Sequence, residues 1–328
     1  MSGRHAVGGG GGGSRGRFPA RTALAIGAIF VAAIVVTVLL VRGGSAPDRS
    51  RPAAAARDAD RAAAPTTSAP AAPSPAAATS PHPVASPFGA PTVGFLGGRS
   101  GTVLAAVYDL RTGQTWTTGS GPPQDEASIV KLDILETLLR QRASRGGSLS
   151  AADQSLTRQM IEDSDNNAAT DLWNEVGGAA GISAFNSAAG LARTTPSGCV
   201  QCPGFPWPGW GLSTTVPADQ LALLREIVEP GPLLSPAARN YALSLMENVT
   251  ESQRWGVSGG VPAGVTVALK NGWLPLNSAS TDWQVNSIGW VSGQGRDYLI
   301  AVVTTGDPTE QYGIDTINGL SALLWPRL

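Results

Sequence analysis

Ten prolines lie between residues 43 and 98, scattered among alanine, serine and threonine with almost no large apolar side chains. A segment of this composition cannot bury enough apolar surface to offset the conformational entropy that folding costs. We therefore expect residues 43–98 to form a disordered, semi-extended linker. A globular domain is then confined to residues 99–328, a stretch long enough to bury a proper core.

Charge also separates the two parts of the chain. Residues 1–98 carry nine arginines and three aspartates, whereas residues 99–328 carry fourteen basic and twenty-one acidic residues. The net charge of −1 therefore conceals a basic front end and a mildly acidic domain. An acidic domain argues against nucleic acid as a partner.

Residues 22–41 are twenty consecutive uncharged residues rich in Ala, Ile, Val and Leu. At about 1.5 Å per residue they match a hydrocarbon core of about 30 Å. We expect a transmembrane helix at residues 22–42 that follows a short, basic, Gly-rich tail at residues 1–21. The alternative is a cleaved signal peptide, although the apolar stretch is longer than a usual signal core.

The same segment leaves its orientation open, because arginines flank both of its ends and the positive-inside rule does not decide. No cysteine follows it before Cys199, which excludes a lipid-modified N-terminus. We expect a single-pass protein of the cell membrane whose C-terminal domain lies outside the cytoplasm and is a monomer.

Strand-like patterns occupy both ends of the domain, and helical patterns occupy its middle. Strands are expected at residues 101–110, 114–118, 283–292 and 298–305. Helices are expected at residues 128–145, 151–162, 167–176, 217–228, 236–248 and 314–325. The pattern predicts an α+β fold in which one sheet is joined from the two ends of the domain.

The domain contains no histidine, because His5 and His82 both lie in the front end. This excludes a Ser-His-Asp triad, a His-containing zinc site and a histidine general base. Cys199 and Cys202 are the only cysteines and cannot build a four-ligand zinc site. We expect neither a metal nor a cofactor, and acid-base chemistry falls to Ser, Lys, Tyr and carboxylates.

The sequence contains only two lysines, Lys131 and Lys270, but twenty-one arginines. Arginine serves equally well as a surface charge but cannot lose its proton, so a retained lysine suggests a chemical role. Lys131 follows Ser128 by three residues at the start of a predicted helix, which places both side chains on one face. Lys131 is therefore a candidate base for activating the Ser128 hydroxyl, the alternative being a surface lysine at a helix start.

Two further short motifs follow this Ser-x-x-Lys pattern in the chain. Ser164-Asp165-Asn166 lies between two predicted helices, and Lys270-Asn271-Gly272 ends an apolar, β-rich run. In this order the three motifs resemble the SxxK, SDN and KTG elements of class A β-lactamases and related penicillin-recognising serine hydrolases. The resemblance covers nearly all of residues 99–328. It implies a β-lactamase-like fold with an antiparallel sheet, an all-helical lobe and an active site between them.

The resemblance also implies a function and a set of roles. The substrate would be a β-lactam or a peptidoglycan peptide, and Ser128 would become acylated with Lys131 as its activating partner. Ser164 would pass a proton to the leaving nitrogen, and Lys270 would hold Ser164 and attract the substrate carboxylate. Substrate contacts would come from Asn166, Asn271, Gly272 and Trp273, with the N–H groups of Ser128 and Trp273 as the oxyanion hole.

The sequence departs from this family in the loop at residues 190–212, which contains no Asp or Glu. Class A enzymes use a glutamate of the corresponding loop to hydrolyse the acyl-enzyme, so the deacylation base is not identified here. We expect the covalent adduct to form and persist, as in a penicillin-binding protein. The alternatives are a non-catalytic domain that binds cell wall or β-lactams on the same fold and, with less support, an interaction module organised by the linker.

Cys199 and Cys202 lie in the same loop and permit three interpretations: a redox dithiol, a partial metal site or a short-loop disulfide. A redox dithiol is expected at a helix start within a βαβ pattern, which is absent here. Outside the cytoplasm a disulfide is the simplest of the three. In the same loop, Trp207 and Trp210 either line a substrate groove or pack in the interior.

Overall fold

A computed structural model describes residues 85–277 and 279–328. The tail at residues 1–21, the transmembrane helix predicted at residues 22–42 and most of the predicted linker lie outside these residues. Within the described part, no helix combines the length and the apolar character needed to cross a bilayer.

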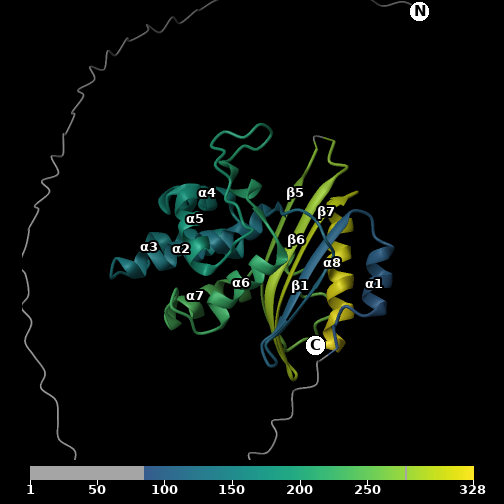
Figure 1. Ribbon diagram of the computed structural model, residues 1–328. Coiled ribbons are helices and arrows are strands. Elements are labelled where there is room, and N and C mark those ends of the chain that lie inside the picture. The colour runs from purple at the N-terminus through teal and green to yellow at the C-terminus, as the bar shows by residue number, and fades with distance from the viewer. Residues whose placement is uncertain (1–84, 278) are drawn as a thin grey trace, which may run out of the picture. The chain divides into compact units, whose positions relative to one another are not determined.

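A five-stranded antiparallel sheet forms the centre of the domain, with the strand order β2-β1-β7-β6-β5 (Figure 1). Strand β1, from the start of the domain, pairs directly with β7 from its end. The prediction of one sheet joined from both ends is therefore confirmed. The strands are β1 (Thr102–Asp109), β2 (Gln114–Thr118), β5 (Thr266–Pro275), β6 (Trp283–Gly293) and β7 (Arg296–Asp307).

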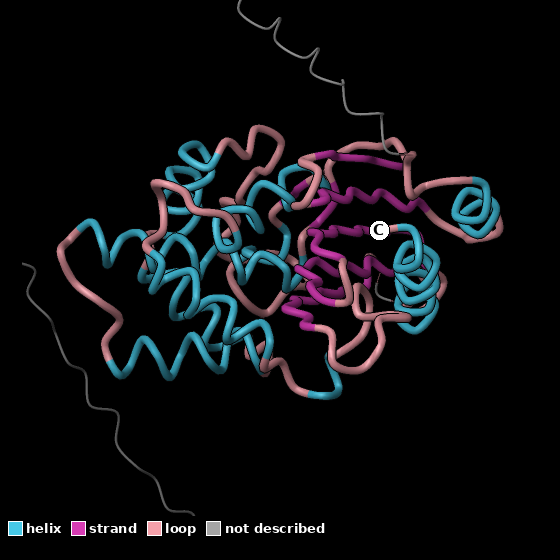
Figure 2. Tube along the Cα trace, turned by 90° about the horizontal axis from the view of Figure 1, so that it is seen from below, coloured by secondary structure: helices cyan, strands magenta, loops and turns pink. Residues whose placement is uncertain are grey.

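Helices cover both faces of this sheet, which gives three layers (Figure 2). One face carries α8 (Glu310–Leu324), with α1 (Ala90–Gly97) packed against it. The other carries an all-helical lobe, whose helices are α2 (Val130–Ser144), α3 (Ala151–Glu162), α4 (Asn166–Glu175), α5 (Gly178–Ala189), α6 (Pro217–Val228) and α7 (Pro236–Glu247). A separate two-stranded sheet consists of β3 (Gln124–Asp125) and β4 (Thr214–Thr215).

The sheet divides the interior into two apolar clusters, because alternate side chains of a strand point to opposite faces. On β7, Leu299, Ala301 and Val303 belong to the cluster shared with the helical lobe. Ile300 and Val302 belong to the cluster beneath α8. Burial on both faces explains why β7 reads as a continuous apolar run rather than an alternating one.

Helix α1 corrects the expected linker boundary at residue 98. Phe88 is buried, and Phe95 packs so closely on α8 that a Cβ added at Gly319 would lie 2.5 Å from its ring. A few aromatic and aliphatic residues in a Pro- and Gly-rich segment therefore suffice to dock it on the domain. The folded domain begins before residue 99.

Most predicted helices agree with the structure, and α5 is the main omission. Its sequence is rich in Gly and Ala and places few side chains inside, among them Ile182 and Phe185. The expected start of α3 is confirmed, since Ser150 caps it and forms a reciprocal capping box with Asp153.

Candidate active site

Ser128 lies in a short 3-10 turn, η1 (Ala127–Ile129), that leads directly into α2. The backbone before the turn is fastened to the sheet, because the Asn286 Nδ2 donates to the carbonyl oxygens of Asp125 and Glu126, each at 2.9 Å. The Ser128 hydroxyl itself makes no hydrogen bond within the described residues. A firmly held backbone thus presents an unengaged hydroxyl, an arrangement suited to a nucleophile.

Lys131 lies in the first turn of α2, three residues after Ser128, and its side chain is completely buried. Its Nζ lies 2.6 Å from the Ser164 carbonyl oxygen, 3.0 Å from the Ser164 Oγ and 2.7 Å from the Asn166 Oδ1. Ser164 has a φ of 56°, a left-handed conformation uncommon for a residue with a side chain. This conformation allows the carbonyl and the hydroxyl of one residue to contact the same amine.

Lys270 reaches the same hydroxyl from the opposite side of the site. Its side chain extends from β5, is completely buried, and brings its Nζ 2.9 Å from the Ser164 Oγ. The same Nζ donates to the Asn271 carbonyl oxygen at 2.9 Å. The sheet and the helical lobe therefore each bring one buried lysine to a single serine.

Burial lowers the pKa of both lysines, because an ammonium loses its hydration inside the protein. For Lys131 burial is the main cause, the charge of Lys270 lowers the pKa further, and Asp165 partly offsets both. Burial lowers the pKa of Lys270 to about 7. Near neutral pH an amine of this pair can give up its proton, and the Ser164 hydroxyl can accept a hydrogen bond from one lysine and donate one to the other.

The residues of the Ser164-Asp165-Asn166 motif make different contacts. Asp165 caps α4, since its Oδ1 accepts a hydrogen bond from the Ala168 N–H at 2.7 Å. Asn166 is the first helical residue and lines the cavity beside Ser128. Asp165 therefore caps the helix, and the Asn166 side chain is left to contact Lys131 and the cavity.

Gly272 allows the sheet to touch the turn that carries Ser128. A Cβ added at this position would lie 2.5 Å from the Ser128 backbone nitrogen and 2.8 Å from that of Ile129. No larger residue fits between β5 and the start of the turn. The first N–H groups of such a turn have no acceptor within it, so the Ser128 N–H remains available for a ligand.

Asn271 lies differently from the substrate-contacting position that the resemblance implied. Its side chain is buried, and its Nδ2 donates to the carbonyl oxygens of Gln253 at 2.7 Å and Trp255 at 3.1 Å. Alternation along β5 turns the Lys270 side chain toward Ser164 and the Asn271 side chain to the loop behind it. Asn271 therefore fastens the strand rather than lining the cavity.

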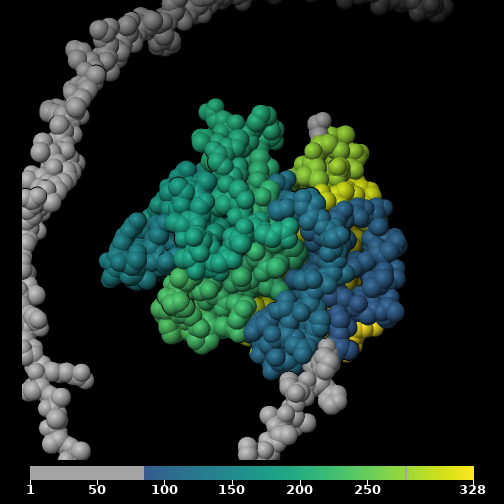
Figure 3. All heavy atoms as spheres, in the orientation of Figure 1, coloured from purple at the N-terminus to yellow at the C-terminus, as the bar shows by residue number. Residues whose placement is uncertain are grey.

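A cavity of about 710 Å³ opens beside Ser128. Figure 3 shows the hollow between the tip of the loop that precedes η2 (Gly209–Leu212) and the tip of the β5–β6 hairpin. The floor includes Asp125 and Ser128, and Asp125 is the only carboxylate among the lining residues that the structure describes. The aromatic lining residues are Phe205, Trp207, Trp210, Trp273 and Trp283.

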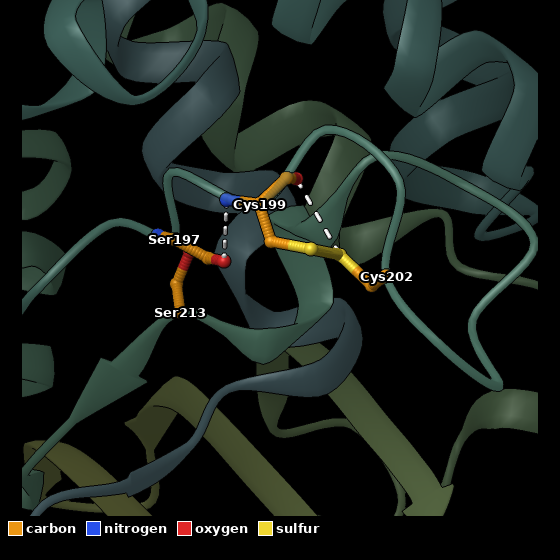
Figure 4. The surroundings of a disulfide bond; sticks show 4 residues. All are labelled: Ser197, Cys199, Cys202 and Ser213. Atoms are coloured by element: carbon orange, nitrogen blue, oxygen red, sulfur yellow. Dashed lines mark hydrogen bonds between the residues drawn. A yellow bond between two sulfur atoms is a disulfide. The ribbon is translucent and has the colours of Figure 1, made fainter.

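The loop wall is held together by a disulfide between Cys199 and Cys202 (Figure 4). The Gly209 N–H donates to the Cys199 carbonyl oxygen at 2.7 Å, and a Cβ added at Gly209 would lie 2.8 Å from the Cys202 Sγ. The disulfide thus packs on the segment that carries the loop's aromatic residues. Among residues 85–277 and 279–328, no group of three or more His, Cys, Asp or Glu residues could hold a metal ion.

Both tryptophans of the loop belong to the wall, but in different ways. Trp210 is almost completely buried and its Nε1 donates to the Thr170 Oγ1 at 3.1 Å. Trp207 is partly exposed and lies with its ring centroid 6.1 Å from that of Trp210. The two interpretations left open by the sequence, groove lining and interior packing, thus both hold.

Asp125 and Trp283 are among the lining residues that sequence reasoning missed. Asp125 stands three residues before Ser128, where an acidic residue ahead of a helix start carries no distinctive signal. Trp283 begins a predicted strand, and only the pairing of β5 with β6 brings it to the site. Neither position belongs to a motif that could have indicated it.

The chain is similar to known proteins over more than half of its length. A family model described as "Beta-lactamase enzyme family" matches residues 143–328. A protein of Mycobacterium bovis named "Putative lipoprotein LppW" is 27% identical over 234 residues, which cover 69% of this chain and 70% of that protein. The protein of the same name from Mycobacterium tuberculosis gives the same values.

Solved structures share the fold at low identity. The TLA-1 extended-spectrum β-lactamase has a TM-score of 0.64 at 18% identity and covers 72% of this chain and 95% of its own. A β-lactamase from Chitinophaga pinensis gives 0.62 at 20% identity, with 72% and 97% covered. PBP-A gives 0.58 at 21% identity, with 69% and 89% covered. The fold expected from the three motifs is confirmed.

Proposed function

Because the chain belongs to the beta-lactamase enzyme family, we propose that its folded domain is a serine hydrolase acylated at Ser128 by a β-lactam or a cell-wall peptide. The observation that carries the proposal is the convergence of Lys131 and Lys270 on the Ser164 hydroxyl. Two fully buried lysines with lowered pKa values are costly in a structural role, and they are suited to moving a proton.

In the proposed acylation, a neutral Lys131 takes the proton of the Ser128 hydroxyl as its oxygen attacks the substrate carbonyl. The Ser128 Oγ–carbonyl bond forms, the carbon–nitrogen bond breaks, and the proton passes through Ser164 to the leaving nitrogen. The hydrogen bond from Lys131 to the Ser164 Oγ supports this route. The free Ser128 hydroxyl would turn toward Lys131 when substrate binds, since such contacts often tighten only in the complex.

Charge stabilisation in this scheme comes from both sides of the cavity. The N–H groups of Ser128 and Trp273 would receive the developing oxyanion, each contributing about 3 to 4 kcal/mol in comparable sites. Lys270 in its ammonium form would attract a substrate carboxylate, and Asn166 would bind the side-chain amide of the substrate. The tight contact of Gly272 with the turn at Ser128 supports the pairing of the two N–H groups.

Release of the acyl group should be slow. The loop at residues 190–212 contains no carboxylate that could activate water, and Asp125 on the cavity floor is the only acid lining the site within the described residues. A variant of PBP-A has been solved as an acyl-enzyme complex with penicillin G. By this reasoning the adduct on Ser128 accumulates, as it would in a penicillin-binding protein.

We place the domain outside the cytoplasm, held at the membrane by residues 22–41 and by the linker that follows. The mycobacterial relatives are named "Putative lipoprotein LppW", whereas this sequence has no cysteine before Cys199 to carry a lipid. An alkaline phosphatase fused after Leu328 is therefore expected to be active. Activity of a cytoplasmic reporter alone at that position would contradict the placement.

The acylation proposal is tested by intact-protein mass spectrometry of the full-length chain in detergent, incubated with benzylpenicillin. Wild type should gain the mass of one penicillin and keep it, whereas Ser128→Ala should gain nothing. Ser155→Ala is the matched control, because Ser155 is an exposed serine of α3 that does not line the cavity. This control should label like wild type.

Three other outcomes have distinct meanings. A short-lived adduct with hydrolysed penicillin would make the protein a β-lactamase with its own deacylation base. Labelling of Ser128→Ala would assign the nucleophile elsewhere. Absence of any adduct in wild type would favour the non-catalytic binding domain, and equilibrium binding of benzylpenicillin would then be the test.

A further inference from the structure

Asp125 is a carboxylate without a partner on the floor of the cavity. Its side chain accepts no hydrogen bond and forms no ion pair with any residue that the structure describes. It is half-buried, and burial raises its pKa. A carboxylate in this position lacks the positive charge or the donors that normally accompany burial.

Among the described residues that line the cavity, Asp125 is the only charged residue, and polar side chains are few. The cavity is lined by no lysine or arginine among the described residues, since Lys131 and Lys270 lie behind its wall. Its polar side chains besides Asp125 are those of Ser128, Asn166, Asn277 and Ser280. The remaining wall is mainly aromatic, with Trp207 on one side and Trp273 and Trp283 on the other.

Both walls and the floor are held in place. Phe205 and Trp207 pack edge-to-face with ring centroids 5.6 Å apart. The Trp283 Nε1 donates to the Ser280 carbonyl oxygen at 2.8 Å, and the Asn286 side chain of the same strand fixes the Asp125 carbonyl. A site with fixed aromatic faces and a fixed carboxylate is preorganised for a ligand rather than shaped by it.

We propose that this cavity recognises the ammonium group of a substrate, with Asp125 as its ion-pair partner and the tryptophan faces of Trp207, Trp273 and Trp283 around it. Aromatic faces attract cations through their quadrupoles, and a carboxylate adds a charge-assisted hydrogen bond. The proposal rests on the function proposed above and specifies its substrate class. The preferred acyl donors would be β-lactams or peptides with a free amino group near the scissile amide.

The chemistry of the wall favours this role over activation of a hydrolytic water by Asp125. A water positioned for attack needs several polar partners, whereas the cavity lining includes the apolar residues Ala127, Gly211 and Leu212. An ammonium, in contrast, needs a negative partner and tolerates apolar or aromatic surroundings. Burial has already raised the pKa of Asp125, and a bound cation would favour its ionised form.

The test compares ampicillin with benzylpenicillin, which differ by one amino group on the side chain. Second-order acylation rates are measured by mass spectrometry for full-length wild type, Asp125→Asn and Trp283→Leu. The ampicillin-to-benzylpenicillin ratio should fall about tenfold or more in Asp125→Asn and about threefold or more in Trp283→Leu. Because both drugs are measured on the same variant, a general effect of the substitution on folding or on the reactivity of Ser128 changes both rates equally and leaves the ratio unchanged.

Asp171→Asn is the matched control, because it removes one exposed carboxylate from α4 without touching the cavity. Its ratio should equal that of wild type. An unchanged ratio in Asp125→Asn overturns the proposal. The proposal is also overturned if Asp125→Asn is acylated normally by both drugs but releases the acyl group more slowly than wild type. The latter would assign Asp125 to the hydrolytic step.

A second measurement separates this proposal from the function on which it rests. Binding of both drugs to Ser128→Ala is followed by tryptophan fluorescence, which needs no acylation. Preference for ampicillin that disappears in Ser128→Ala/Asp125→Asn supports ammonium recognition even if wild type is never acylated. Equal binding of the two drugs in both proteins rejects it even if acylation occurs.

Discussion

Helix α2 carries two kinds of buried ionisable side chain, a lysine and carboxyl groups, which differ in their hydrogen bonding. At its first turn, Lys131 is completely buried and finds three oxygen acceptors on Ser164 and Asn166. Less than two turns later, Glu136 is equally buried, and neither of its carboxylate oxygens has a hydrogen-bond partner within the described residues. The lysine is therefore organised as part of a site, whereas the glutamate is tolerated in the interior.

Glu136 is one of several carboxylates in this part of the helical lobe. Burial is the main cause that raises the pKa of Glu126, Asp133 and Glu136, and the negative charge of Asp133 raises the pKa of both glutamates further. These groups avoid the cost of a buried charge by keeping their protons. The lysines lose part of their affinity for protons, which is useful for catalysis. The acids gain affinity, which makes stability depend on pH.

The largest expected effect is that of Lys131→Met, which keeps most of the side-chain volume and removes the amine. Acylation by benzylpenicillin should fall by about 10² to 10⁴, the usual contribution of a positioned base. Glu136→Gln, on the same helix but away from the cavity, should remain close to the wild-type rate. Mass spectrometry of the full-length variants measures both. Wild-type labelling of Lys131→Met would show that the two buried residues do not differ in function.

The second effect concerns stability and uses Asp133→Asn. Burial raises the pKa of Asp133 to about 7, against 3.8 without burial. Between these values the folded state holds a proton that the unfolded state has lost, so stability is fully present below pH 4 and falls as the pH rises through about 7. The total loss is about 4 kcal/mol, at about 1.4 kcal/mol for each pKa unit. Asn cannot ionise, so the variant should gain up to this amount at pH 8 and little at pH 4.

Urea unfolding of the full-length protein at a series of pH values measures this change. Asp171→Asn serves as the exposed counterpart and should leave the pH profile of wild type intact. Parallel profiles for wild type and Asp133→Asn would mean that the buried carboxyl does not change its protonation on unfolding. The proposed difference between Lys131, which takes part in the site, and the buried carboxyl groups, which only make stability depend on pH, would then not hold.

The sequence predicted the fold well where periodicity and order along the chain carry information. The terminal strands, the helices α3 and α6 and the closing helix lie close to their expected ranges. It failed at α1 and α5, because Gly- and Ala-rich segments owe their helical form to packing against α8 and the lobe rather than to a pattern of their own. It also could not identify a buried face of α2, in which every residue from 130 to 139 is buried.

The candidate site was predictable only as far as its motifs extend. The motifs indicated Ser128, Lys131, Ser164 and Lys270, and the last three meet in the structure as a hydrogen-bonded group. The direction of the Asn271 side chain and the presence of Asp125 in the cavity depend on strand pairing and on how β5 meets the turn at Ser128. Short sequence patterns contain no information about such long-range contacts.

The smallest expected effect concerns the backbone of Ser164, where both lysines meet. A left-handed φ of 56° costs about 1 kcal/mol for a residue with a side chain and little for glycine. Ser164→Ala and Ser164→Gly both remove the hydroxyl, so both should lose acylation to the same extent. Ser164→Gly should nevertheless have a free energy of unfolding about 1 kcal/mol higher than that of Ser164→Ala in urea titrations, because only glycine relieves the strain.

This pair of variants tests whether the active site imposes the left-handed φ angle of Ser164. In this conformation the carbonyl and the hydroxyl of Ser164 both face the Lys131 Nζ. If Ser164→Ala and Ser164→Gly are equally stable, the backbone conformation at residue 164 carries no strain. If Ser164→Gly is more stable yet equally inactive, strain is the cost of engaging Lys131, a cost that the unpartnered carboxylate of Glu136 on the same helix does not incur.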